Sequence, residues 1–115
     1  MNRRPLLLLV CSSPLLGECL CRELAPLDCE CRLVPEAADA ASLTTDAALI
    51  LVELLLAGEV GFQALRRLRS NYAGPLVLLS GSGRPSDEPW ALAAGASQVL
   101  SYPLRHEALR ALLPS

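Results

Sequence analysis

The sequence contains no lysine, and its ten basic residues are all arginine. This absence excludes mechanisms that need an amine, such as Schiff-base catalysis or a phosphate-binding loop built around a lysine. Aromatic residues make up only 3% of the chain, which leaves few rings for stacking on bases or sugars. The net charge is −2, so a concentrated basic face for nucleic acid is not expected. We therefore expect no nucleic-acid binding by this domain.

The chain also lacks an apolar run that could span a membrane. Its longest run, 49–58, covers about ten residues and contains Glu53, whereas a spanning helix needs roughly 20. Two arginines precede a short apolar stretch that ends at Cys11, a pattern that resembles a lipoprotein signal. That stretch is short for an export signal and Val10 is not a small residue, so a buried first strand is favoured. We expect a cytoplasmic protein without membrane attachment.

The chain has five cysteines, an odd number that favours reduced thiols in the absence of an export signal. Apart from Cys11 they form two Cys-x-Cys pairs, Cys19 with Cys21 and Cys29 with Cys31. Zinc sites usually separate such pairs by two or more residues, and two such positions on a helix point about 200° apart. Packing of small side chains is therefore favoured over a metal site, and we expect no metal or cofactor.

The 115 residues, 52% of them hydrophobic, predict a single domain over 1–115 with one core. Apolar runs typical of buried strands alternate with amphipathic stretches typical of helices. The expected strands are 6–10, 29–34, 47–52, 76–79 and 98–100. The expected helices are 14–26, 35–45, 60–68 after a loop at 58–61, a helix through Trp90 that ends at Gly95, and 104–112.

Five strands that alternate with five helices predict a doubly wound α/β fold, a parallel sheet with helices on both faces. Functional groups of such folds lie at the carboxyl ends of the strands. The residues at these ends are Cys11 and Ser12 after the first strand, Glu53 after the third, Ser80 after the fourth and Tyr102 after the fifth.

Cys11 is a candidate nucleophile, because a helix start can lower the pKa of a thiol. A cysteine phosphatase would carry an arginine six positions later, but that position is Gly17, and Pro14 removes one backbone N–H group. A small cysteine-based phosphotransfer enzyme using Cys11 is the alternative function. Glu53 has no second acid at the end of the first strand, so a magnesium site is not expected.

Four segments, in order, resemble a response-regulator receiver domain, the phosphoacceptor module of bacterial two-component signalling. They are LLLLVCSSPLL, DAALILVELLLAGEVG, GPLVLLSGSG and AAGASQVLSYPL, and the resemblance covers residues 5–113. It implies a flavodoxin-like five-stranded parallel sheet with strand order 2-1-3-4-5 and five helices. It also implies that Glu53 takes the phosphoacceptor position, Ser80 the hydroxyl switch position and Val99 the aromatic switch position.

The departures from the receiver pattern concern the residues that carry phosphoryl transfer. The family's acidic pair falls on Cys11 and Ser12, its acceptor aspartate on Glu53 and its lysine on Tyr102. Without the acidic pair and the lysine, no metal ion and no second cation would neutralise the transferred group. We therefore expect a degenerate pseudo-receiver that is not an enzyme. Glu53 either mimics a phosphorylated aspartate or is a tolerated polar residue, and an unconventional receiver phosphorylated on Glu53 is a further alternative.

The resemblance also implies a docking face made by the fourth helix, the fifth strand and the fifth helix. Trp90, Arg105 and Arg110 would lie on that face, and Trp90 either anchors an interface or packs in the core. The expected partners are a signalling protein, a fused effector domain, or a second copy of the chain in a homodimer. Signalling by protein–protein interaction is therefore the predicted function.

Overall fold

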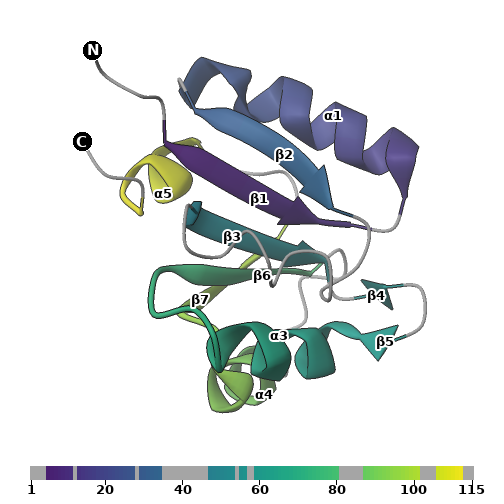
Figure 1. The fold of residues 1–115 in the computed structure, drawn as a ribbon, viewed down its shortest axis with the longest axis vertical. Helices are drawn as coiled ribbons and strands as arrows, with labels where there is room; N and C mark the ends of the chain where they lie inside the picture. The colour runs from purple at the N-terminus through teal and green to yellow at the C-terminus, as the bar shows by residue number, and fades with distance from the viewer. Residues whose placement is uncertain are drawn as a thin grey trace.

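A parallel β-sheet of five strands forms the centre of the protein in the computed structural model (Figure 1). The structure describes residues 5–11, 13–27, 29–34, 47–53, 55–56, 59–80, 87–101 and 106–112. The strands of the sheet are β1 (Leu6–Val10), β2 (Glu30–Val34), β3 (Ala47–Glu53), β6 (Leu76–Ser80) and β7 (Gln98–Ser101). Their order is β2-β1-β3-β6-β7, which confirms the predicted order 2-1-3-4-5.

The strands form where the sequence has continuous apolar runs, as expected for strands that are covered on both faces. All five residues of β1 are buried, and β3 is buried from Leu49 to Val52. Glu53 ends β3 and is the one charged residue of that strand. The edge strand β2 differs, because its burial alternates and only Val34 is fully buried.

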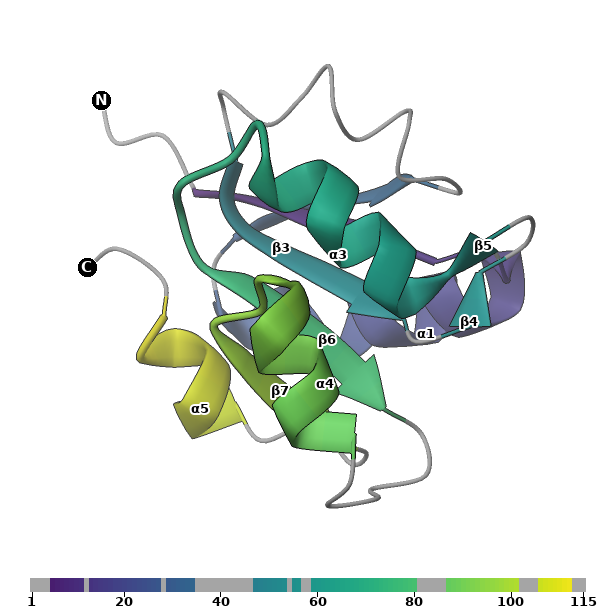
Figure 2. The same cartoon turned by 90° about the horizontal axis from the view of Figure 1, so that it is seen from below.

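Helices cover both faces of the sheet, because alternate side chains of the strands point to opposite sides. Figure 2 shows α3 (Gly61–Arg69) and α4 (Asp87–Ala94) in front of the sheet and α1 (Pro14–Leu24) behind it. The core on the α3–α4 side includes Leu8, Val10, Ile50, Val52, Leu65, Leu68, Leu78 and Ala91. The core on the side of α1 and α5 (His106–Arg110) includes Leu7, Leu9, Cys11, Leu20, Leu24, Leu51, Leu79 and Leu109.

Four α-helices lie in the part of the chain that the structure describes, whereas five were predicted. The helix expected at 35–45 falls outside the described residues. The helix predicted from Pro14 to Pro26 ends slightly early, and a 3-10 helix, η1 (Ala25–Leu27), completes it. None of the helices in the described ranges is long and apolar enough to cross a membrane.

The prediction of a loop at 58–61 was wrong. A small antiparallel pair forms there instead, between β4 (Leu55–Leu56) and β5 (Glu59–Val60). Val60 therefore belongs to a strand and not to the helix that follows it. The strand pairing satisfies backbone N–H and C=O groups that an open loop would leave to water.

The end of α4 matches its prediction. Gly95 has a φ of 120°, a left-handed conformation that suits glycine. The N–H group of Gly95 donates to the carbonyl oxygen of Leu92 at 3.1 Å. The N–H group of Ala96 donates to the carbonyl oxygen of Ala91 at 3.0 Å. This pair of hydrogen bonds is the Schellman motif, which ends a helix and turns the chain toward β7.

A single arginine ties the end of α3 to the turn that precedes β7. The guanidinium group of Arg69 donates to the carbonyl oxygens of Gly95 at 2.8 Å, Tyr72 at 2.7 Å and Gly74 at 2.9 Å. It also donates to the hydroxyl oxygen of Ser97 at 3.3 Å. Arg69 is therefore a structural residue.

Replacing this arginine should destabilise the protein. We expect Arg69→Ala to lower the free energy of unfolding by about 2–4 kcal/mol, because several acceptors lose a charged donor at once. The matched control is Arg66→Ala at an exposed position of the same helix, expected to change stability by no more than about 0.5 kcal/mol. Urea denaturation would measure both, and equal losses in the two variants would contradict this role.

Candidate functional site

The candidate site lies at the carboxyl ends of two neighbouring strands, β1 and β3. Val10 pairs with Val52, so the residues that follow them, Cys11 and Glu53, lie side by side at one edge of the sheet. The backbone N–H group of Cys11 donates to the carbonyl oxygen of Val34 at 2.9 Å, which holds this residue against β2 as well. The sheet itself therefore positions both side chains.

The thiol of Cys11 contacts the carboxylate of Glu53. Its Sγ atom donates to Oε2 of Glu53 at 2.9 Å, and the carbonyl oxygen of Ser13 lies 3.5 Å from the same sulfur. Cys11 is only 1% exposed, whereas Glu53 is half-buried. A partly buried carboxylate needs a hydrogen-bond donor, and here a thiol provides it. The sequence analysis did not predict this contact.

The surroundings of Cys11 keep its thiol protonated. Burial first, and then the hydrogen bond to Glu53, raise the pKa of Cys11 from its usual 9.0 to about 11. The negative charge of Glu53 acts in the same direction, because it disfavours a second anion beside it. Reactive cysteines have lowered pKa values, so this environment is the opposite of an activated nucleophile's.

The first turn of α1 passes close to β2 at Gly17. Gly17 is buried where α1 passes close to β2, and a Cβ atom there would lie 2.6 Å from both Cδ atoms of Leu33. Glycine at this position therefore allows the helix to pack against the strand. The large side chain that a cysteine phosphatase carries there would displace Leu33.

The structure places the other predicted site residues in different settings. Ser80 ends β6, where its backbone pairs with Ser101 of β7. Val99 is half-buried in β7 and packs against the core on the α3–α4 side. Ser12, Tyr102 and Arg105 lie outside the described residues. Within the described ranges, no group of three or more histidine, cysteine or acidic side chains could hold a metal ion.

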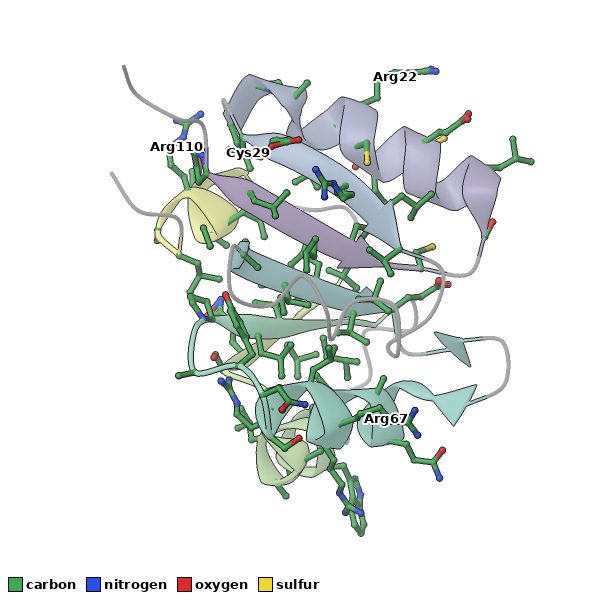
Figure 3. All side chains as sticks on the ribbon, viewed as in Figure 1. Arg22, Cys29, Arg67 and Arg110 are labelled. Carbon is green, nitrogen blue, oxygen red and sulfur yellow. The ribbon has the colours of Figure 1, made fainter. Side chains whose placement is uncertain are left out.

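The predicted docking residues that the structure describes are exposed. Trp90 on α4 is 67% exposed, which excludes its packing in the core, and Leu92 on the same helix is 45% exposed. Arg110 is exposed on α5, away from the carboxyl end of β1 (Figure 3). β7 is the edge strand next to these helices. α4 packs beside β7, which β3 and β6 separate from β1 (Figure 1).

Solved structures of response-regulator receiver domains share this architecture. The BeF3-activated N-terminal receiver domain of Klebsiella pneumoniae RstA matches with a TM-score of 0.80 and 24% identity, covering 92% of each chain. The Vibrio cholerae chemotaxis protein CheY4 matches with a TM-score of 0.82 and 19% identity, over 96% of this chain and 99% of that one.

A third similar structure is a Burkholderia pseudomallei response regulator that contains a phosphorylated aspartic acid and a calcium ion. It matches with a TM-score of 0.80 and 20% identity, over 96% of this chain and 67% of that one. No family model matches the sequence, and no curated protein sequence does. The chain therefore has the flavodoxin-like fold of response-regulator receiver domains.

Cys11 should react slowly with alkylating reagents at neutral pH. With a pKa of about 11, only about one thiol in ten thousand is ionised at pH 7. The test uses a variant in which the other four cysteines are serine, and intact mass follows its labelling by iodoacetamide. The labelling rate should rise only as the pH approaches 11. Glu53→Gln should shift this rise to lower pH, because it removes the neighbouring negative charge. Rapid labelling near pH 6 would identify Cys11 as an activated nucleophile and contradict this account.

Proposed function

We propose that this chain is a receiver-like signalling module of two-component regulation that acts by protein–protein interaction, without conventional aspartate phosphorylation. The observation that carries the proposal is the 2.9 Å hydrogen bond between the thiol of Cys11 and the carboxylate of Glu53. The resemblance to receivers assigns these two positions to the metal-binding acidic pair and to the phosphoacceptor.

The thiol–carboxylate pair is poorly suited to binding magnesium. Magnesium prefers several oxygen ligands in octahedral geometry, and a protonated thiol is not such a ligand. The raised pKa of Cys11 keeps that proton in place at neutral pH. The thiol also already donates a hydrogen bond to one carboxylate oxygen of Glu53. A phosphoryl group arriving there would meet one negative carboxylate and no metal cation.

The same features weigh against the enzymatic alternative. A nucleophile for phosphotransfer must be largely ionised or have a base beside it. Glu53 accepts a hydrogen bond from Cys11 and could in principle act as that base. Burial, this hydrogen bond and the negative charge of Glu53 instead raise the pKa of the Cys11 thiol to about 11. The proposal therefore includes no catalytic activity and no cofactor.

The exposed apolar side chains of α4 support signalling through contact with a protein. We define the α4 surface as Trp90 and Leu92, which are 67% and 45% exposed. A large exposed tryptophan is typical of an interface anchor, because it buries much area at little cost in conformational entropy. The resemblance to receivers also assigns Arg110, which is exposed on α5, to the docking face. The proposed partner is a signalling protein, a fused effector domain or a second copy of the chain, in the cytoplasm.

Treatment with a small phosphodonor tests whether the site takes phosphate. After incubation with magnesium and acetyl phosphate, we expect the intact mass of the wild-type chain to gain no phosphoryl group. The double variant Cys11→Asp with Glu53→Asp is the comparison, because two carboxylates at adjacent strand ends supply oxygen ligands for magnesium. It should bind magnesium more tightly than the wild type in calorimetry. A phosphoryl adduct on Glu53 would contradict the proposal, and one on Cys11 would favour the enzyme.

Truncating Trp90 tests the α4 surface. If the chain self-associates in sedimentation equilibrium, Trp90→Ala should raise the dissociation constant at least tenfold, because interface anchors contribute about 2 kcal/mol or more. Leu15→Ala is the matched control, since Leu15 is 78% exposed on α1 at another surface. An equal effect of both changes, or no effect of Trp90→Ala on a dimer that does form, would rule out this surface as the dimer interface.

A further inference from the structure

Two cysteine side chains from different elements meet beside the sheet. The Sγ atoms of Cys21 on α1 and Cys31 on β2 lie 2.7 Å apart. A disulfide bond requires about 2.05 Å, so bond formation needs the two sulfurs to move together by less than about 1 Å. The contact joins one residue from each Cys-x-Cys pair, and not the two residues of one pair.

The other cysteines are arranged differently, so the structure selects this pair. Cys19 lies two residues before Cys21 on α1, and side chains two residues apart on a helix point in nearly opposite directions. Cys19 is accordingly exposed. Arg22, the neighbour of Cys21, points away from the sheet (Figure 3). Cys29 is buried near the start of β2, where its thiol bonds to the carbonyl oxygen of Leu24 at 3.8 Å.

We propose that Cys21 and Cys31 form a reversible disulfide when the protein meets a peroxide, which makes this dithiol a redox-sensitive site. Both thiols are free and half-buried, so a small oxidant can reach them. The site is distinct from the Cys11–Glu53 pair and does not depend on how the chain signals.

The reaction balances with one peroxide molecule. One thiol of the pair reacts with hydrogen peroxide to give a sulfenic acid and one water. The other thiol then attacks that sulfur, which forms the S–S bond and releases the hydroxyl group with its own proton as a second water. The two sulfurs together lose two electrons, and the O–O bond of the peroxide accepts them.

Either sulfur can be oxidised first, because both side chains are half-buried and the two sulfurs lie in mutual contact. Whichever thiol becomes the sulfenic acid, the other lies within reach to attack it.

The disulfide would fasten an edge strand of the sheet. Among the strands that the structure describes, β2 pairs with β1 alone, and its first four residues are exposed or half-buried. Edge strands with few buried contacts open more readily than central ones. A covalent bond from α1 to β2 closes a short loop between the two cysteines and restricts the unfolded chain. Oxidation should therefore stabilise the protein and slow amide exchange in β2.

The experiment compares the wild-type chain with three single variants after treatment with hydrogen peroxide. Cys21→Ser and Cys31→Ser remove the pair, and Cys19→Ser is the matched control on the same helix. Intact mass, with and without a thiol reductant, reports the loss of two hydrogen atoms per chain. Hydrogen exchange of β2 and the melting temperature report the physical consequence, with an increase of roughly 5–15 °C expected on oxidation.

The proposal predicts the loss of two hydrogens in the wild type and in Cys19→Ser, its reversal by reductant, and its absence from the other two variants. Cys21→Ser and Cys31→Ser should each stop at a sulfenic acid on the remaining cysteine of the pair, which dimedone traps. The proposal is overturned if the wild type is unchanged, if the mass loss persists in Cys31→Ser, or if disulfide-linked dimers form instead. Circular dichroism of each reduced variant establishes that it is folded before oxidation.

Discussion

The register between β1 and β3 is the constraint on which the candidate site depends. Because Val10 pairs with Val52 in the middle of a buried parallel sheet, Cys11 and Glu53 must emerge next to each other. A slip of one residue would turn the apolar side chains of a strand to the wrong face, so the two cores hold this register firmly. The site is therefore a direct consequence of how the sheet packs.

The chemistry of this site depends on Cys11, a thiol at a position where the resemblance to receivers implies a carboxylate. Two carboxylates at adjacent strand ends repel each other unless a cation lies between them. A protonated thiol instead donates a hydrogen bond to Glu53 and needs no cation. The pair thus needs no metal ion between its side chains, which agrees with the proposal that this module signals without a change of phosphorylation state. The partly exposed Cys21–Cys31 pair, on the same face of the sheet as Cys11, offers a second, oxidant-dependent reaction.

The sequence was sufficient to predict the five strands of the parallel sheet, most clearly β1, β3 and β6, which are short apolar runs, but it missed the small β4–β5 pair. The strand order needed the resemblance to receiver domains, since apolar runs alone do not say which strands are neighbours. Contacts between side chains were the part that was missed. Cys11 and Glu53 are 42 residues apart and Cys21 and Cys31 are 10 apart, so their contacts depend on register and helix rotation. A usable signal existed for the first pair, because both residues directly follow the apolar run of adjacent strands.

The most direct test of the central claim is a manganese titration followed by amide resonances in the NMR spectrum. Manganese occupies magnesium sites and broadens the signals of nearby nuclei. We predict that the amide signals of Cys11 and Glu53 keep their line widths at metal concentrations that saturate ordinary receiver domains. Selective, saturable broadening at these two residues would show that the thiol–carboxylate pair holds a divalent cation, and it would contradict the account of a metal-independent signalling module.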